Sequence, residues 1–262
     1  MRLTRLYVDA PLASGGLLEL PAHAATHVAR VLRARDGDPV VLFNGDGREF
    51  ESRIESVRGL RVTVAVGAGR TVTRESPIAL TLLQCLPRGD RMDWIVQKAT
   101  ELGVARIVPL VSRRSVVKIS AIQAEAKTAH WRAIAVAACE QSGRNRVPTI
   151  DTPRGLDDHL GAIGNAGVRV VFEPDASPHP ATMAGTDRTP PAELDFAIGP
   201  EGGFDPQELE GLRLAGFRSV RLGPRILRTE TAAIAALVWL QSRFGDLRGE
   251  DRAEPANHDP SR

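Results

Sequence analysis

Short runs of alternating apolar and polar residues fill the first part of the chain. Residues 40–47 join an apolar run to Asn-Gly-Asp-Gly, a strong turn signal. Residues 50–54 and 60–66 follow, and the second run alternates with a period of two, which is typical of a half-buried strand. A short helix is expected over 23–32. These patterns predict a small β-barrel over residues 1–73, near the lower size limit for independent folding.

Beyond a polar linker at 70–77, strand-like runs alternate with helix-like periodicity. The predicted strands cover 79–86, 106–111, 168–172, 194–198 and 219–222, and the predicted helices cover 91–102, 121–141, a segment starting at 206, and 231–244. Such alternation predicts an α/β domain with a mostly parallel sheet that is covered on both faces.

Capping residues set the expected helix ends. Asp90, Ser120 and Asp205 are predicted N-caps, and Pro206 suits the first helical position. The helix after Asp90 has one apolar face, formed by Met92, Ile95, Val96, Ala99 and Leu102. Gly103 is expected to end it.

Composition narrows the class of protein. Hydrophobic residues make up 42% and charged residues 25%, as in soluble globular chains. No apolar run approaches the roughly 18 residues of a membrane span, and the first residues lack the apolar part of a secretory signal. Cys85 and Cys139 lie far apart, which supports neither a disulfide framework nor a cysteine zinc site. We therefore expect a reduced, cytoplasmic protein without metal or membrane contact.

The net charge of +2 is unevenly distributed. Residues 1–75 carry +2, residues 76–150 carry +6 and residues 151–262 carry −6. A basic middle fits contact with a polyanion, and it fits a solvated helix surface equally well. Aromatic residues are only 4%, which argues against an RNA-binding surface built from rows of stacking rings.

Two predicted strands end in loops that contain Gly-Pro, at 198–204 and 222–231. Ligands of open α/β sheets bind at the carboxyl ends of strands, glycine lets the backbone approach a ligand, and each loop leads into a helix N-terminus. Neither loop has the GxGxxG or GxxxxGK[ST] pattern of nucleotide sites. Taken alone, the loops are most simply tight turns, so the residues indicate at most a small-ligand site.

The exact sequences of the two loops point to a protein family. Residues 199–209, GPEGGFDPQEL, and 222–237, LGPRILRTETAAIAAL, resemble the C-terminal half of the RsmE family, the 16S rRNA (uracil-N3)-methyltransferases of the SPOUT class. Further segments resemble the same family in the same order: 27–33, 88–103, 140–148 and 244–247. The resemblance covers residues 1 to about 247, and long motifs in the right order are specific.

The resemblance implies an architecture. Residues 1–73 would be a PUA-like RNA-binding β-barrel, and residues 74–247 a SPOUT methyltransferase domain with a C-terminal trefoil knot. Residues 248–262 form a polar tail without a counterpart in the family, and we predict that it is disordered. Family members are homodimers. The apolar last helix suits a dimer interface and an ordinary core equally.

The implied reaction transfers a methyl group from S-adenosylmethionine to N3 of a decoding-centre uridine in the 16S rRNA of the small ribosomal subunit, without a metal. The protein must hold the methyl donor and N3 in line and help N3 lose its proton. Two alternatives stay open: a SPOUT enzyme that methylates another atom of rRNA or tRNA, such as a ribose 2′-OH, and a non-catalytic RNA-binding assembly factor.

The resemblance also implies site residues. Those expected at the cofactor are Phe172, Gly199, Gly202, Leu222, Gly223, Pro224, Ile226, Leu227 and Thr231. Those expected in catalysis are Arg228, Glu230, Glu201 and Arg144. Those expected at the RNA are Arg2, Arg5, His27, Arg30, Arg33, Arg88, Arg91, Glu140, Arg144 and Arg146.

The catalytic roles follow from the chemistry of uracil N3. A carboxylate with a raised pKa in a dry pocket could accept the proton, and Glu201, Glu230 and Glu140 are the candidates. Glu201 and Glu230 could equally cap helices. Arg228 or Arg144 would stabilise negative charge on the uracil oxygens. Arg228 could instead pair with Glu230 or with the cofactor carboxylate.

Overall fold

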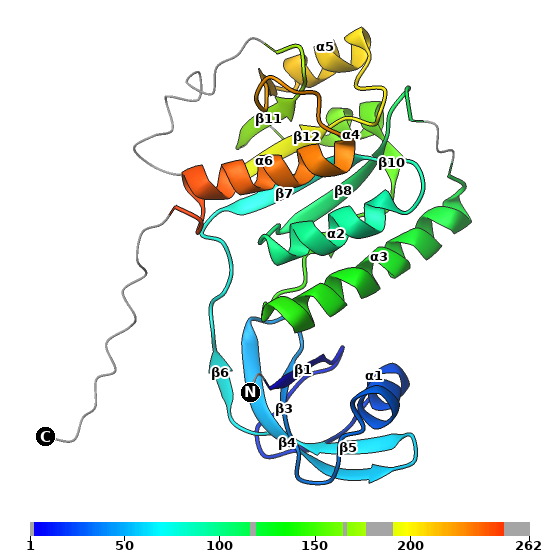
Figure 1. Ribbon diagram of the computed structural model, residues 1–262, viewed down its shortest axis with the longest axis vertical. Coiled ribbons are helices and arrows are strands. Elements are labelled where there is room, and N and C mark those ends of the chain that lie inside the picture. Colours follow the sequence, from blue (N-terminus) through cyan, green and yellow to red (C-terminus); the bar gives the residue numbers. More distant parts are fainter. Residues whose placement is uncertain (1–2, 116–118, 165–166, 177–190, 249–262) are drawn as a thin grey trace, which may run out of the picture.

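The computed structural model describes residues 3–115, 119–164, 167–176 and 191–248, and arranges them around two β-sheets (Figure 1). The smaller sheet uses residues up to Thr71, and the larger one begins at Ala79. Arg2 and the predicted tail from residue 249 onward lie outside the described residues.

The smaller sheet has six strands among the described residues. They are β1 (Thr4–Tyr7), β2 (Leu17–Glu19), β3 (Pro39–Phe43), β4 (Arg48–Arg58), β5 (Arg61–Ala65) and β6 (Gly69–Thr71). Their order is β1-β3-β4-β5-β2, with β6 also paired to β4, and only the β1–β3 pair is parallel. The strands predicted from alternation are confirmed as β3, β4 and β5. The strands β1, β2 and β6 are too short for periodicity to predict them individually.

The predicted helix over 23–32 has two parts. An α-helix, α1 (Ala22–Thr26), continues as a π-helix, η1 (His27–Leu32). Arg33 ends it in the left-handed region with φ +51°, which is uncommon for a residue other than glycine. The π-helix buries Val28 in the core of the smaller sheet and leaves His27 and Arg30 exposed. Such wide turns are frequent at functional sites.

The larger sheet is parallel at every strand pair in the described residues, as predicted. Its strands are β7 (Ala79–Cys85), β8 (Arg106–Val111), β9 (Thr149–Ile150), β10 (Arg154–Gly155), β11 (Val168–Phe172), β12 (Glu193–Ile198) and β13 (Arg218–Val220). The order is β10-β8-β7-β12-β11-β13, and β9 also pairs with β8. The predicted strand at 219–222 ends at Val220, so Leu222 lies in the following loop.

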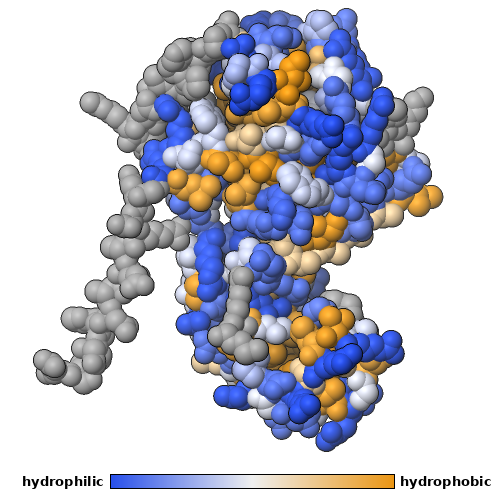
Figure 2. Space-filling view, viewed as in Figure 1, coloured by the Kyte–Doolittle hydropathy of each residue, from blue (hydrophilic) through white to orange (hydrophobic). Residues whose placement is uncertain are grey.

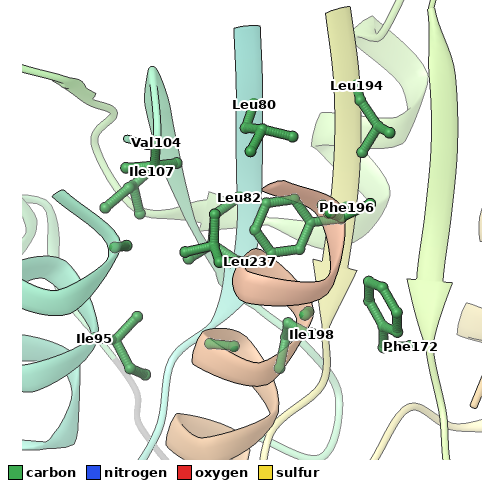
Figure 3. Close-up of a cluster of buried hydrophobic side chains, with 14 of the residues drawn as sticks. Leu80, Leu82, Ile95, Val104, Ile107, Phe172, Leu194, Phe196, Ile198 and Leu237 are labelled. Carbon is green, nitrogen blue, oxygen red and sulfur yellow. The ribbon is translucent and has the colours of Figure 1, made fainter. Parts of the chain in front are cut away.

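Helices cover both faces of this sheet, also as predicted. They are α2 (Arg91–Glu101), α3 (Ala121–Ser142) and α6 (Thr229–Phe244) on one face, and α4 (Leu156–Ala162) and α5 (Pro206–Leu214) on the other. Figure 3 shows the first face, where Leu237 of α6 lies near Phe196 and Ile198 of β12. The seven-residue α4 escaped prediction because it is short. None of the described helices combines the length and hydropathy needed to cross a membrane.

Two of the three predicted N-caps are confirmed. Ser120 and Asp205 each form a reciprocal capping box with the residue three positions later. Asp90 occupies the N-cap position of α2, but its side chain makes no capping hydrogen bond. The last helix begins at Thr229, two residues before the predicted start.

The two sheets meet at a buried polar joint around Arg144, which is 4% exposed. The Arg144 guanidinium donates to Glu75 at 2.5 and 3.0 Å, and to the backbone carbonyls of Thr100 and Val104 at 2.8 and 3.0 Å. One side chain therefore fastens the linker to α2 and to the turn that follows it. A buried guanidinium with this many acceptors is well satisfied.

Glu49 of β4 is the second charge in this joint. Its carboxylate accepts from Arg5 at 2.8 Å and Arg74 at 2.9 Å, and it lies 2.9 Å from Arg70. Burial on its own would raise the pKa of Glu49, but the hydrogen bonds and charges of Arg74 and Arg5 outweigh it and lower the pKa from 4.5 to about 2. The Arg5 guanidinium also donates to Asn145 at 2.5 Å, which links the smaller sheet to the segment after α3.

This pKa predicts acid sensitivity. The folded pKa of Glu49 lies below its unfolded value, so the stabilisation is complete above about pH 4.5 and is lost as the pH falls toward 2. Replacement Glu49→Gln should lower the free energy of unfolding at pH 7 by roughly 3 kcal/mol and flatten its decline between pH 5 and 3. Urea denaturation across this range measures both effects, with Glu19→Gln as the exposed control. A Glu49→Gln curve parallel to that of the wild type would contradict the assignment.

Candidate functional site

A cavity of about 440 Å³ opens at the carboxyl ends of β11, β12 and β13. The loops after β12 and β13 form much of its wall. Its apolar lining includes Phe172, Ile198, Phe204, Leu222, Ile226, Leu227 and Ala232, and its polar lining includes Arg114, Glu173, Glu201, Arg221, Arg225, Arg228 and Thr229. Apolar walls with a few convergent polar groups are typical of a small-molecule site.

The first glycine loop, residues 199–204, is a tight turn held by its own backbone. The Gly203 N–H donates to the Pro200 carbonyl at 2.9 Å. A Cβ atom at Gly199 would lie 3.3 Å from the Phe204 ring, so a larger residue would press against this buried side chain. The need for glycine at position 199 is therefore steric, and its carbonyl accepts from the Thr229 hydroxyl at 2.7 Å.

The second glycine loop, residues 221–228, links β13 to α6. Gly223 has φ +70°, a conformation that favours glycine. Ile226 lines the cavity although 85% of it is exposed, which is unusual for an aliphatic side chain. Arg228 is the N-cap residue of α6 and is exposed at the cavity mouth.

Arg91, the first residue of α2, connects the first glycine loop to the first turn of α6, which follows the second loop. Its Nη1 lies 2.5 Å from Oε1 of Glu201, and its Nε lies 3.6 Å from Oε1 of Glu230. Partial burial would raise the pKa of Glu201, but the Arg88 backbone N–H and the Arg91 charge lower it below its usual value. Glu201 is thus a fixed anion, which corrects the expectation of a raised pKa. The Oε2 atom of Glu230 is buried and has no hydrogen-bond partner among the described residues.

The structure brings most of the residues expected at the cofactor into this cavity. Six line it: Phe172, Gly199, Gly202, Leu222, Ile226 and Leu227. Gly223 and Pro224 are exposed in the second loop without lining it, and Thr231 is exposed on α6. Of the expected catalytic residues, Glu201 and Arg228 line the cavity, whereas Glu230 lies beside it with Arg91.

Sequence reasoning missed five charged residues of the lining, namely Arg114, Glu173, Asp175, Arg221 and Arg225. Arg114 comes from the loop after β8, and its Nη1 donates to the Gly202 carbonyl at 2.9 Å. No sequence motif predicts this contact, because it depends on how the loop after β8 folds over the edge of the sheet. Glu173 directly follows β11 and Arg221 directly follows β13, and their place after a strand was the available signal. Asp175 and Arg225 lie further along the same two loops.

The structure corrects three other expectations. Arg144 lies in the buried joint, so it does not line the cavity and is almost inaccessible to RNA. Arg5 is likewise buried, with only 7% of its side chain exposed, and it binds Glu49. Glu140 accepts from the Tyr7 backbone N–H at 2.9 Å, again at the joint. The segment 140–145 therefore joins the two sheets instead of lining the cavity.

The remaining residues expected at RNA are on the surface. His27, Arg30, Arg33, Arg88 and Arg146 are exposed, and Arg91 is partly exposed and bound to the two glutamates. Arg2 lies outside the described residues. Three of them, His27, Arg30 and Arg33, lie on the π-helix or at its end.

The described residues hold no obvious metal site or reactive thiol. Within the ranges that the structure describes, no three or more His, Cys, Asp or Glu side chains are placed to hold a metal ion. Cys85 and Cys139 are free and buried, and burial raises the pKa of each thiol to about 12. Both thiols are therefore un-ionised at neutral pH and serve packing.

Comparison with known proteins gives consistent matches over both sheets. Residues 74–241 match a family model described as an RNA methyltransferase domain, and residues 20–66 match one described as an RNA methyltransferase PUA domain. A ribosomal RNA small subunit methyltransferase E from Bacillus subtilis is 35% identical over 228 residues, which cover 86% of this chain and 89% of that protein. The protein of the same name from a Buchnera aphidicola strain is 32% identical and covers 94% and 98%.

Solved structures agree with these matches. A methyltransferase from Legionella pneumophila, solved with the cofactor SAM bound, has a TM-score of 0.87 and 38% identity and covers 94% of this chain and all of that one. A ribosomal RNA small subunit methyltransferase E from Neisseria gonorrhoeae, bound to S-adenosyl methionine, has a TM-score of 0.85 and 35% identity, with coverage of 94% and 99%.

The contacts of Arg91 predict that it holds the first glycine loop and the start of α6 in place. Replacement Arg91→Gln should speed amide hydrogen exchange in residues 200–203 and 226–230, because Glu201 and Glu230 lose their shared cation. The free energy of unfolding should change by less than about 1 kcal/mol, since the pair is partly exposed. Mass-spectrometric exchange compares this variant with Arg213→Gln, whose pair with Glu210 lies on α5. Unaltered exchange in both segments would overturn the prediction.

Proposed function

The chain belongs to the ribosomal RNA small subunit methyltransferase E family, whose members combine an RNA methyltransferase domain with a PUA domain, and on that basis we propose that it methylates N3 of a uridine in 16S rRNA, with S-adenosylmethionine as methyl donor. The proposed target lies in the decoding centre of the small ribosomal subunit. The observation that carries the proposal is the cavity between the two glycine loops.

The cavity fits the donor. Its volume of about 440 Å³ falls in the range of small-molecule sites. Phe172, Leu222 and Leu227 supply apolar walls for a flat, neutral adenine, and the glycine loops expose backbone groups around it. When bound, S-adenosylmethionine supplies a methyl group already activated by its sulfonium. The chain must therefore orient the donor, exclude water and handle one proton.

The proton of uracil N3 needs an acceptor. Glu201 is paired with Arg91 and has a lowered pKa, which makes it a poor base and a good anchor. Glu230 keeps one buried oxygen without a partner among the described residues, so it is the better acceptor of the two. Arg228, exposed at the cavity mouth, would stabilise the negative charge that develops on the uracil oxygens.

The RNA would dock on the smaller sheet as well as at the cavity. His27, Arg30 and Arg33 project from the π-helix, and Arg88 precedes α2 beside Glu201. These exposed groups are suited to phosphates and splayed bases. An rRNA substrate also implies a cytoplasmic site of action.

A homodimer belongs to this proposal. Val238 of α6 is 42% exposed, and Ile234 and Ala235 on the same helix are half-buried. Figure 2 shows apolar surface in the region where α6 runs in Figure 1. Such a face is suited to a second copy of the chain. The trefoil knot stays a prediction.

Mapping of methylated nucleotides tests the proposal directly. Small-subunit rRNA from cells that lack this protein should lose one methyl group on a decoding-centre uridine, and the wild-type gene should restore it. The Arg228→Ala variant should fold and bind S-adenosylmethionine but leave the base unmethylated, because the developing charge loses its cation. Loss of a ribose methyl group would assign the enzyme to another RNA atom. Unchanged methylation would favour a non-catalytic assembly factor.

The salt dependence of rRNA binding tests the docking surface. Affinity should fall steeply with salt through counterion release. The double variant Arg30→Ala with Arg33→Ala should reduce the slope of log K against log salt by about 1.5, since each phosphate contact contributes about 0.7 to 0.9. Filter binding at several salt concentrations measures the slope, with Arg213→Ala as control. An unchanged slope would exclude the π-helix from the interface.

A further inference from the structure

Three polar groups form a chain beneath the cavity. The side-chain Nε2 of Gln84 donates to the Thr229 hydroxyl at 3.0 Å, and this hydroxyl donates to the Gly199 carbonyl at 2.7 Å. Gln84 is fully buried and Thr229 is 4% exposed. Water therefore does not compete for these hydrogen bonds, and each is strengthened by the low local dielectric.

The direction of every bond in this chain is fixed. Gln84 Nε2 also donates to the Cys85 carbonyl at 2.8 Å, and a carbonyl can only accept. The amide nitrogen must therefore face both Cys85 and Thr229. The Thr229 oxygen then accepts from Gln84, which commits its single proton to the Gly199 carbonyl. No alternative arrangement satisfies both carbonyls.

These hydrogen bonds join parts of the cavity wall that lie far apart in the sequence. Gln84 lies at the end of β7, where it pairs in register with Ile198 of β12. Gly199 is the first residue of the first glycine loop, and Thr229 follows the second loop and lines the cavity. One hydroxyl thus ties both loops to the central strand.

Helix capping does not explain Thr229. The N-cap residue of α6 is Arg228, and Thr229 is already the first helical residue. Its hydroxyl donates to a carbonyl outside the helix, whereas a cap accepts from a helix N–H. In addition, Oε1 of Gln84 is buried without a partner among the described residues, an arrangement that costs stability. An apolar residue at position 84 would avoid that cost, which points to a role in the site.

We propose that Thr229 is a positioning residue for the methyl donor: its hydroxyl, oriented by Gln84, holds the two glycine loops at the spacing that the donor requires before the donor arrives. This inference rests on the proposed function, because it assumes that the cavity binds S-adenosylmethionine. It gives roles to two residues, Gln84 and Thr229, that were not among the predicted site residues. Preorganisation of this kind raises affinity by reducing the ordering that binding must impose.

Two substitutions at one position test the proposal. Thr229→Val keeps the branched shape and removes the hydroxyl, and it should weaken S-adenosylmethionine binding at least tenfold by calorimetry on the full chain. Thr229→Ser restores the hydroxyl and should bind within about threefold of wild type. Steady-state kinetics should show a raised KM for the donor and an unchanged KM for rRNA. Thr100→Val is the matched control, since Thr100 is also buried in a helix with its hydroxyl bound to a carbonyl.

A second position keeps the test decisive if Thr229→Val is unstable. Gln84→Met removes the amide and leaves the Thr229 hydroxyl free to rotate, so donor affinity should fall about threefold. Because both residues act through the same series of hydrogen bonds, the double variant should bind S-adenosylmethionine no more weakly than Thr229→Val alone. Additive losses, or wild-type affinity in Thr229→Val, would overturn the inference. If the wild-type chain itself does not bind S-adenosylmethionine, the proposed function fails instead.

Discussion

The common direction of the strands in the larger sheet is the constraint on which the site depends. Because every pair is parallel, the carboxyl ends of β7, β11, β12 and β13 meet at one edge. Residues from distant parts of the chain are thereby delivered to one place. The backbone groups beyond the last ladder bonds need new partners, and the turns of the glycine loops, the Thr229 hydroxyl and the Arg114 guanidinium provide them.

The polar joint fixes the orientation of the two sheets relative to each other. Burying Arg144 and Glu49 removes charges from water, which is costly unless each finds several partners. Arg144 has Glu75 and two carbonyls, and Glu49 has three arginines within 2.9 Å. Apolar residues could bury as much surface, but they would accept many relative orientations. Directional hydrogen bonds accept few, so the joint fixes how the smaller sheet sits against the larger one.

Periodicity and capping residues predict much of the fold. The apolar face of α2 and the N-caps at Ser120 and Asp205 follow from patterns within one segment each, and the parallel sheet follows from the alternation of strands and helices after residue 79. The resemblance of the two glycine loops located the cavity. The sequence could not place the segment 140–145, because its partners lie about 40 to 140 residues away and no local pattern encodes them. For the same reason it could not show that Arg91 contacts both Glu201 in the first loop and Glu230 in α6.

Because long-range contacts are not encoded locally, the role of a charged residue in a recognisable motif is easily predicted wrongly. Arginine is suited equally to phosphates and to buried carboxylates, and only the fold decides between them. Arg144 and Arg30 are the same residue type, yet Arg144 is buried in the joint and Arg30 is exposed on the π-helix. Burial of the guanidinium itself separates the two uses: Arg144 is buried against Glu75 and backbone carbonyls, whereas Arg30 is exposed.

Rigidity at the joint sets a geometric requirement on whatever binds. Because Arg144, Arg5 and Glu49 fasten the smaller sheet, the joint restricts how the exposed π-helix moves relative to the cavity. The fixed arrangement of these two surfaces favours a target whose shape matches it. On the proposed docking of RNA at both places, a folded RNA would contact the π-helix and the cavity together, whereas a short single strand would reach only one, so the three-dimensional shape around the base would contribute to selection as well as the base itself.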